Sequence, residues 1–182
     1  MSPTVRLARV GDLERLREIE RLAGRLFAEI GMTLVAEDEP ASVEELRAFV
    51  AEGRSFVAEA PDLPGVPAGY LLVAEVDGVA HLEQVSVDPV YTGQQLGRLL
   101  VEQAVAWARD HDYPAITLTT FTDVAWNRPW YTRLGFSAVE PLTPGLRAIR
   151  DHEKAHGLDR WPRAAMRREI WARAADRNRM AQ

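Results

Sequence analysis

The first 54 residues combine one short alternating run with two amphipathic patterns. Residues 4–8 alternate polar and apolar side chains, which is typical of a short strand. After Gly11-Asp12, apolar residues recur at helical spacing and predict a helix with this buried face: Leu16, Ile19, Leu22, Leu26 and Ile30. Ser42 followed by Glu45 matches a capping box, which predicts a second helix to about Glu52. We expect residues 32–41 between them to form a loop.

Three apolar-rich runs follow, over Ser55–Ala60, Ala68–Val76 and Val79–Asp88. Proline and glycine residues at 61–67 separate the first two runs, and Asp77-Gly78 between the last two is a strong signal for a two-residue hairpin turn. The pattern therefore predicts an antiparallel meander that ends near residue 88.

The pattern then becomes helical over Leu96–His111, with an apolar face formed by Leu99, Leu100, Ala104 and Trp107. Ala115–Phe121 is rich in β-formers and follows this helix, so we expect it to pair in parallel through a right-handed crossover. Beyond it, the sequence predicts a short helix near Trp126–Leu134 that ends at Gly135, a strand at Phe136–Val139, a helix from the cap Thr143 to His156, and a final strand at Ala164–Trp171.

These elements indicate an α+β protein with a mixed, mostly antiparallel central sheet flanked by helices. The length of 182 residues suggests one domain over 1–182, with a core in 1–140 and a helix, a last strand and a basic tail in 141–182. The hydrophobic fraction of 47% is that of a globular protein. Cysteine is absent, which excludes disulfides, cysteine zinc sites and a cysteine nucleophile.

Charge and hydropathy limit the partners. No run approaches the ~20 apolar residues of a membrane span, and no signal-peptide pattern opens the chain, so we expect a soluble cytoplasmic protein without a membrane partner. Residues 147–182 carry 10 basic and 5 acidic residues, a mixture that favours a solvated segment over a nucleic-acid-binding face. The acidic run Glu37–Glu39 is either a solvated loop or an attractant for a cationic substrate.

The segment from Val85 to Gly97 (VSVDPVYTGQQLG) is the first with chemical content. A strand ends at Pro89, a loop with Gly93 follows, and a helix begins near Leu96. Backbone N–H groups at a helix N-terminus bind anions, so this junction suits a pyrophosphate, although the same pattern also occurs in structural turns. It lacks the lysine of a Walker loop, and a meander precedes it instead of a Rossmann unit.

A second pattern follows the strand at 115–121, where Asn127, Tyr131, Gly135 and Phe136 stand in the order Asn-x-x-x-Tyr-x-x-x-Gly-Phe. With these residues the chain resembles the GNAT superfamily of N-acetyltransferases. The resemblance extends from about residue 4 to 140 and includes the order of strands and helices as well as both motifs. It implies a fold with splayed mid-sheet strands that form an acyl-CoA cleft.

The resemblance implies acetyl-CoA as cosubstrate and no metal. The family's loop, Arg/Gln-x-x-Gly-x-Gly/Ala, corresponds here to residues Thr92, Gly93, Gln94, Gln95, Leu96 and Gly97, followed by Arg98. Gly97 matches, whereas Thr92 and Gln95 depart from the pattern, and Gln95 suits its position if its backbone is helical. The resemblance also implies that the main chain of Val85, Ser86 and Val87 holds pantetheine and the acetyl carbonyl, with Asn127 on the pantetheine arm and Tyr131 near the sulfur.

Acetyl transfer to an amine requires a base, a group that polarises the thioester carbonyl, and an acid for the thiolate. A phenol such as Tyr131 can donate the last proton. Glu83 and His81 lie on the same strand face as Val85 and Val87; Glu83, acting through a water, is our first candidate for the base and His81 the second. Without cysteine an acyl-cysteine route is impossible, so direct transfer in a ternary complex is favoured.

Two alternatives remain. A non-catalytic acyl-CoA sensor on the same fold would explain the departures at Thr92 and Gln95. His152, Glu153 and His156 also match the H-E-x-x-H pattern of zinc hydrolases, but they end a helix just before Gly157, where a solvated helix end is the simpler interpretation. The sequence does not distinguish a small-molecule from a peptide amine acceptor, and homodimers, frequent in the family, remain open.

Overall fold

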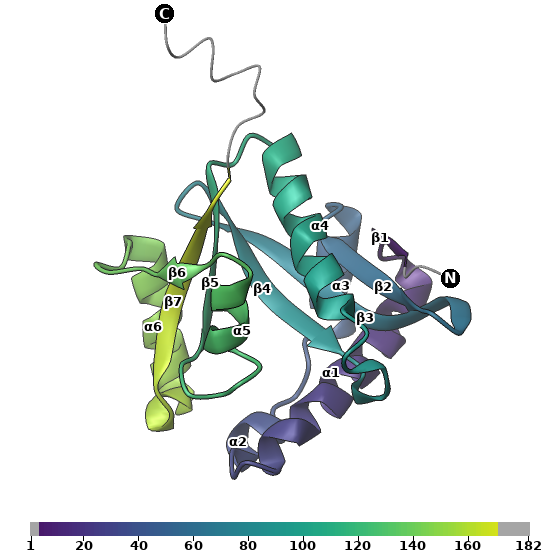
Figure 1. Cartoon of the computed structure of the whole chain (residues 1–182), viewed down its shortest axis with the longest axis horizontal. Coiled ribbons are helices and arrows are strands. Elements are labelled where there is room, and N and C mark those ends of the chain that lie inside the picture. The colour runs from purple at the N-terminus through teal and green to yellow at the C-terminus, as the bar shows by residue number, and fades with distance from the viewer. Residues whose placement is uncertain (1–3, 171–182) are drawn as a thin grey trace, which may run out of the picture. The chain divides into compact units, whose positions relative to one another are not determined.

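The computed structural model describes residues 4–170 (Figure 1). The chain divides into two compact units. Unit 1 comprises the residues up to Ala74 together with Glu83–Ala104; unit 2 comprises Glu75–Leu82 and the residues from Val105 onward. Seven strands hydrogen-bond in the order β1-β2-β3-β4-β5-β7-β6, mostly antiparallel. This confirms the α+β class and the mixed sheet; the single domain over 1–182 stays a prediction.

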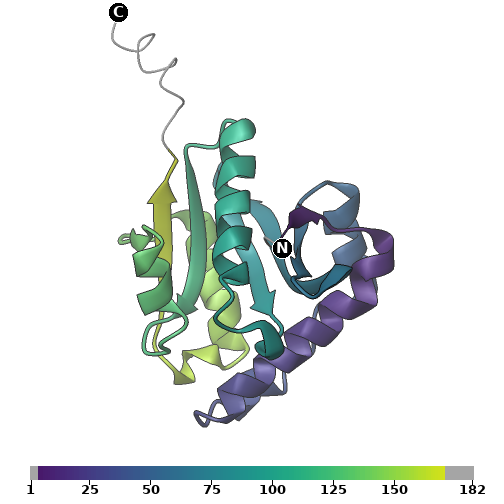
Figure 2. The ribbon, with the colours of Figure 1, turned by 45° about the vertical axis from the view of Figure 1, so that its right-hand side comes forward.

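Unit 1 contains the N-terminal strands and helices. In chain order these are β1 (Val5–Leu7), a 3₁₀ turn (Val10–Asp12), α1 (Leu13–Ala28), α2 (Thr33–Ala36), α3 (Val43–Ala51), β2 (Ser55–Ala60) and most of β3 (Leu63–Val76). It also holds the end of β4 (Val79–Val87), a 3₁₀ turn (Pro89–Tyr91) and the start of α4 (Leu96–Asp110). In Figure 2, α1 is the long purple helix that leads to α2. None of the helices within residues 4–170 is long and apolar enough to cross a membrane.

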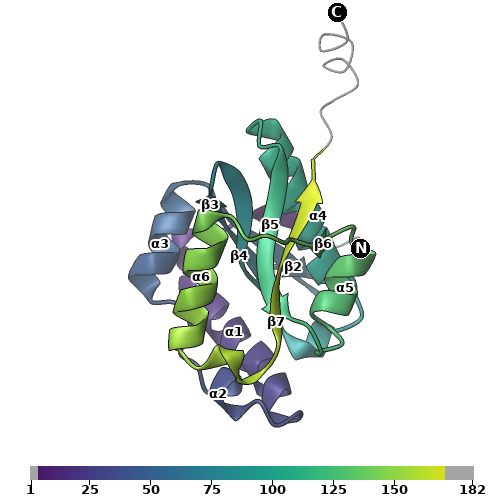
Figure 3. The ribbon, with the colours of Figure 1, turned by 90° about the vertical axis from the view of Figure 1, so that its left-hand side faces the viewer.

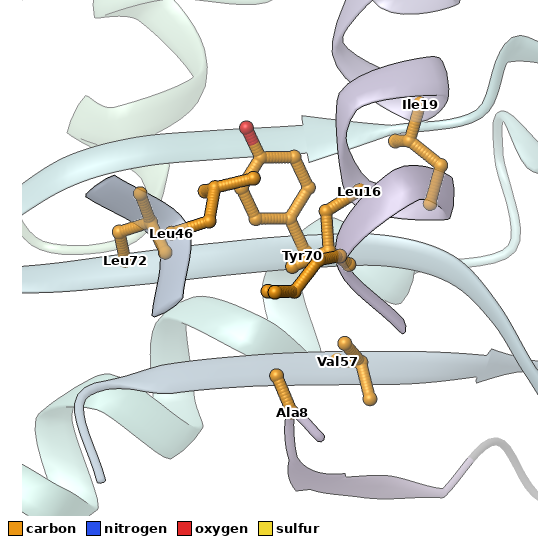
Figure 4. Close-up of a cluster of buried hydrophobic side chains, with 8 residues drawn as sticks. Ala8, Leu16, Ile19, Leu46, Val57, Tyr70 and Leu72 are labelled. Atoms are coloured by element: carbon orange, nitrogen blue, oxygen red, sulfur yellow. The ribbon is translucent and has the colours of Figure 1, made fainter. Parts of the chain in front are cut away.

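A cluster of apolar side chains fills the core of unit 1 (Figure 4). Leu16 and Ile19 of α1 are fully buried there, as is Leu46 of α3. The predicted helix face is therefore correct at its centre. It is wrong at Ile30, which is 48% exposed because α1 ends at Ala28, two residues earlier.

The loop predicted at residues 32–41 and the helix predicted after Ser42 had different outcomes. The capping box of α3 is confirmed, because the hydroxyl of Ser42 accepts the N–H of Glu45 at 3.2 Å and the Glu45 carboxylate accepts the N–H of Ser42 at 2.7 Å. The loop expected at 32–41 instead contains α2, and Met32 is buried. A helix of four residues is too short to show a helical repeat in the sequence.

Strand β3 begins at Leu63, five residues before the predicted start. Its pairing with β2 shifts register twice around Glu59, and Gly65 takes a φ of +86°. Such irregular pairing tolerates proline, which cannot donate to a regular ladder, so the prolines at 64 and 67 do not end the strand.

Unit 2 contains the remaining elements. They are the β3–β4 turn, the end of α4, β5 (Ala115–Phe121), α5 (Arg128–Arg133), β6 (Ser137–Ala138), α6 (Pro144–Ala155), a 3₁₀ turn (Leu158–Arg160) and β7 (Arg163–Glu169). The predicted parallel pairing of β5 is confirmed by its register with β4, and β7 pairs with β5 along its whole length. Helix α6 lies beside β7 (Figure 3). Trp171 and the basic tail lie outside the described residues.

The turn at Asp77-Gly78 has positive φ at both residues, +52° and +72°, as the predicted two-residue hairpin requires. Thr143 is the N-cap residue of α6, also as predicted, but its side chain does not cap the helix. Instead, its hydroxyl and the N–H of Gly145 both donate to the carboxylate of Asp77, the latter at 2.9 Å. The cap thus comes from a residue 68 positions away from Gly145 in the chain.

The predicted apolar face of α4 is only partly correct. Leu100 and Ala104 are fully buried, whereas Leu99 and Trp107 are half-buried. The buried stripe also includes four residues that the prediction omitted, namely Leu96, Val101, Val105 and Ala108. A buried stripe this wide is typical of a helix that packs on a sheet. The buried face is rotated relative to the predicted one, because Val101 and Val105 are buried where Leu99 and Trp107 were expected.

Candidate functional site

The end of β4 is packed closely against β3 within unit 1. The N–H of Asp88 donates to the carbonyl of Ala68 at 2.8 Å, and a Cβ at Gly69 would stand only 3.0 Å from the carbonyl oxygen of Ser86. A side chain at position 69 would therefore require the neighbouring residues to shift. This packing fixes the main chain of the three predicted acyl-binding residues, Val85, Ser86 and Val87.

An ion pair that the sequence did not reveal holds the same strand end. The buried carboxylate of Asp88 pairs with Arg15 of α1 and accepts the N–H of Val90 at 3.1 Å. Arg15 also donates to the carbonyl of Pro67 at 3.1 Å, so one guanidinium joins α1 to β3 and β4. Arg15 and Asp88 are 73 positions apart, and no local pattern marks such a pair.

The loop after β4 contains two residues in the left-handed region, Gly93 with φ +83° and Gln95 with φ +62°. The condition under which Gln95 would suit its position, a helical backbone, is therefore not met in the right-handed sense. Position 95 turns the chain into α4, and this turn requires the conformation that glycine adopts most easily. The loop opens on a cavity of about 310 Å³ lined by Gly93, Gln94, Gln95 and Leu99.

Helix α4 begins directly after this turn. Leu96, Gly97 and Arg98 form its first turn, with the Leu96 side chain buried and that of Arg98 exposed. The first N–H groups of a helix have no partner inside it and carry a partial positive charge, so they bind anions. The predicted loop residues thus combine a cavity with helix N–H donors, which suits the phosphates of CoA.

Asn127 immediately precedes α5 in unit 2. Its side-chain amide donates to the hydroxyl of Thr120 on β5 at 2.9 Å, while its backbone carbonyl accepts the N–H of Trp130 and Tyr131. Thr120 therefore orients the Asn127 side chain through the amide nitrogen. The amide oxygen of Asn127 takes no part in this hydrogen bond. The sequence analysis did not identify Thr120 as a partner of Asn127.

Tyr131, one turn into α5, packs edge-on against Trp130 and Phe136, with ring centroids 4.9 and 5.7 Å away. Burial raises the pKa of the Tyr131 phenol, so it remains protonated at neutral pH and can donate a proton. Gly135, with φ +87°, ends the helix as predicted.

His81 is buried on β4, and its Nδ1 lies 2.8 Å from the hydroxyl oxygen of Thr117 on β5. Burial lowers the pKa of His81 to about 4, which leaves the imidazole neutral and makes it a weak base. Glu83, by contrast, has an exposed side chain.

Comparison with known proteins identifies the family. The model of the acetyltransferase (GNAT) family matches residues 14–136. The chain belongs to this family. An amino-acid acetyltransferase from Mycobacterium tuberculosis (strain ATCC 25618 / H37Rv) is 30% identical over 146 residues, which cover 78% of this chain and 73% of the relative.

Solved structures show the same fold for this acetyltransferase. Rv2747 from Mycobacterium tuberculosis, crystallised in complex with CoA, covers 92% of this chain and 99% of its own with a TM-score of 0.70 and 20% identity. A GNAT family acetyltransferase from Brucella melitensis, in complex with acetyl-CoA, is 25% identical over 75% of this chain and 83% of its own, with a TM-score of 0.55. Membership of the GNAT family, together with the acetyltransferase relative, makes this chain an acetyl-CoA-dependent N-acetyltransferase.

The H-E-x-x-H residues of this acetyltransferase have another role. Arg163 binds the buried carboxylate of Glu153 through two nitrogens, at 2.8 and 3.0 Å, and Arg150 and Thr119 also donate to it. The Glu153 carboxylate is thus engaged in ion pairs and is not oriented as a metal-site base. Within residues 4–170 no group of three His, Asp or Glu side chains could hold a metal ion.

Proposed function

We propose that this acetyltransferase moves the acetyl group of acetyl-CoA directly to a primary amine while both are bound. The observation that carries this proposal is the loop of Gly93 and Gln95, whose two left-handed residues open a cavity at the N-terminus of α4. An anion-binding loop of this shape suits the pyrophosphate of CoA. The oriented amide of Asn127 supports contact with the pantetheine arm.

In the proposed reaction, the amine nitrogen forms a bond to the acetyl carbon and the bond from that carbon to sulfur breaks. Glu83 takes the amine proton through a water, and Tyr131 gives a proton to the leaving thiolate. The low pKa of His81 makes it the weaker candidate for the base. Backbone N–H groups of Val85–Val87 polarise the thioester carbonyl, because donors fixed in the sheet need no reorganisation during the reaction.

We propose an amino acid or another small primary amine as the acceptor. The name of the relative that is 30% identical, an amino-acid acetyltransferase, supports the first of these. A peptide N-terminus is the alternative, and an acceptor screen that contains free amino acids, simple amines and short peptides separates them.

Titration calorimetry with acetyl-CoA and with CoA alone tests the cosubstrate site. We expect micromolar binding that is lost in Asn127→Ala and weakened in Gly97→Trp, because the first removes the pantetheine partner and the second fills the phosphate site. Gly11→Ala is the matched control, since a Cβ there meets no atom within 4 Å. Absence of binding to the wild-type protein at millimolar ligand would reject the proposal.

Steady-state CoA release with an amine panel tests the catalytic roles. General acid–base groups contribute about 10²- to 10⁴-fold, so Glu83→Gln should lower kcat by at least about 100-fold with the Kd of acetyl-CoA unchanged. Tyr131→Phe should lower kcat in the same way, whereas His81→Gln should have a smaller effect. Binding of acetyl-CoA without turnover of any amine would favour a sensor instead.

A further inference from the structure

Helix α1 carries a half-buried carboxylate that the proposed reaction does not use. Glu20 accepts a hydrogen bond from the hydroxyl of Tyr70, which lies on β3 and is fully buried. Tyr70 belongs to the apolar cluster of unit 1, together with Leu16 and Leu72 (Figure 4). One neutral donor therefore holds this carboxylate beside an apolar core.

The arginines near Glu20 compensate its charge only in part. The nearby Arg17 donates to the carbonyl of Ala41 at 3.1 Å, and Arg21 pairs with Glu39 at 3.4 Å. No ion pair is formed by Glu20 itself in this part of the chain. Burial raises the pKa of Glu20 and Asp38 adds to this effect, which outweighs the lowering by the Tyr70 hydrogen bond and by the charges of Arg17 and Arg21.

The position of Tyr70 links this carboxylate to the strand proposed to hold the acetyl group. Ala68 and Asp88 face each other across β3 and β4, since the N–H of Asp88 donates to the carbonyl of Ala68. Tyr70 is the neighbour of Gly69 in the chain, and a Cβ at Gly69 would stand 3.0 Å from the carbonyl oxygen of Ser86. Glu20 is thus placed over β3 beside the proposed acyl-binding segment, entirely within unit 1.

A carboxylate that loses water without gaining an ion-pair partner is costly, and such groups concentrate at binding sites. A positively charged ligand group would supply the missing partner. The reacting nitrogen must lose its proton before attack, and a carboxylate that stabilised its protonated form would oppose the reaction. The group held by Glu20 must therefore be a second cation of the acceptor.

We propose that Glu20, oriented by Tyr70, binds a non-reacting positively charged group of the acceptor, so that the preferred acceptors are diamines or basic amino acids. This inference rests on the proposed acetyl transfer. The other charged groups around Glu20 are consistent with it, because Asp38 adds negative charge while both Arg17 and Arg21 are held by other acceptors.

Pairs of acceptors matched in length test this inference. The kcat/KM for 1,4-diaminobutane is compared with that for butylamine, and the value for L-lysine with that for L-norleucine. In the wild-type protein the cationic member of each pair should be preferred. Glu20→Gln should reduce that preference at least about tenfold through KM, with the KM of acetyl-CoA unchanged. Tyr70→Phe should reduce it less, because the carboxylate remains.

Glu14→Gln, an exposed change on the same helix, is the control and should preserve the preference. Asp38→Asn, which should weaken the preference more mildly, replaces Glu20→Gln if that variant does not fold. Equal wild-type rates within each pair, or an equal loss for both members in Glu20→Gln, would overturn the inference. If no amine is turned over, calorimetric titration with 1,4-diaminobutane and butylamine still decides it, because selective diamine binding that Glu20→Gln abolishes supports the site without the reaction.

Discussion

The two units are stabilised by different chemistry. In unit 1, α1 and α3 bury leucine and isoleucine side chains against β2 and β3. In unit 2, α6 is attached to β5 and β7 by a buried polar cluster of Thr119, Glu153 and Arg163, and the Arg163 guanidinium also lies 4.2 Å from the centre of the Phe121 ring. An apolar contact tolerates any side chain of similar volume, whereas a buried ion pair requires both partners.

Removal of one charge from the polar cluster of unit 2 should have the largest effect. Glu153→Ala leaves Arg150 and Arg163 without their shared carboxylate, and breaking a buried pair in this way typically costs about 3–5 kcal/mol. Urea unfolding should show a loss in this range. Asp151→Asn, an exposed change on the same helix, should stay within roughly 0.5 kcal/mol of the wild type. A loss for Glu153→Ala no larger than that of the control would show that the cluster is not stabilising.

Truncation in the apolar cluster of unit 1 should cost somewhat less. Leu46 is fully buried, so Leu46→Ala removes apolar contacts and leaves a cavity, with an expected loss of about 3 kcal/mol in the same unfolding experiment. Leu46→Met should cost less than about 1.5 kcal/mol, because it preserves volume. A loss in Leu46→Met as large as that in Leu46→Ala would mean that the cluster depends on exact shape as strictly as the polar cluster depends on charge.

The buried histidine of unit 2 predicts a pH dependence that unit 1 does not share. The pKa of His81 falls from 6.5 to about 4 on folding, so the fold favours the neutral imidazole. The free energy of unfolding therefore keeps its full value above pH 6.5. It falls as the pH drops from 6.5 toward 4, by up to about 1.4 kcal/mol per pH unit. Unfolding free energies of the wild type and His81→Gln, measured from pH 7 to 5, should converge toward acid pH; parallel curves would contradict the burial effect.

The smallest effect should come from the loop between β4 and α4. Gln95 adopts φ +62°, which costs a residue with a side chain about 1 kcal/mol more than glycine. Gln95→Gly should therefore change stability by no more than about 1 kcal/mol, in the stabilising direction, without weakening acetyl-CoA binding. Thermal unfolding and acetyl-CoA titration measure both. Clear destabilisation, or lost binding, would show that the Gln95 side chain makes a contact that outweighs the backbone conformation.

The same contrast explains what the sequence could predict. The capping box of Ser42 and Glu45 and the turn at Asp77-Gly78 were predicted correctly, because each is formed by neighbours in the chain. The order of strands followed from alternation and turn residues. The family motifs placed Asn127 and Tyr131 at the start of one helix, and the structure shows the local contacts that orient them.

The missed features depend on residues distant in the chain. Arg15 and Asp88 pair across 73 positions, and Thr119 and Glu153 across 34, so neither partner is distinguished from an ordinary surface residue. The left-handed backbone of Gln95 was not predicted, for a related reason. Its conformation follows from where the loop must deliver α4, and not from the preference of glutamine itself.

The cap of α6 has a consequence for the order of folding. The hairpin turn at Asp77-Gly78 joins adjacent strands, and isolated hairpins form within about 1–10 μs. The cap contact from Asp77 to Gly145 must close a chain segment of 68 positions and carries a larger entropic cost. Because Thr143 does not cap the helix itself, α6 gains its stable N-terminus only when the hairpin is already present. We therefore expect the β3–β4 hairpin to form first and α6 to be capped against it afterwards.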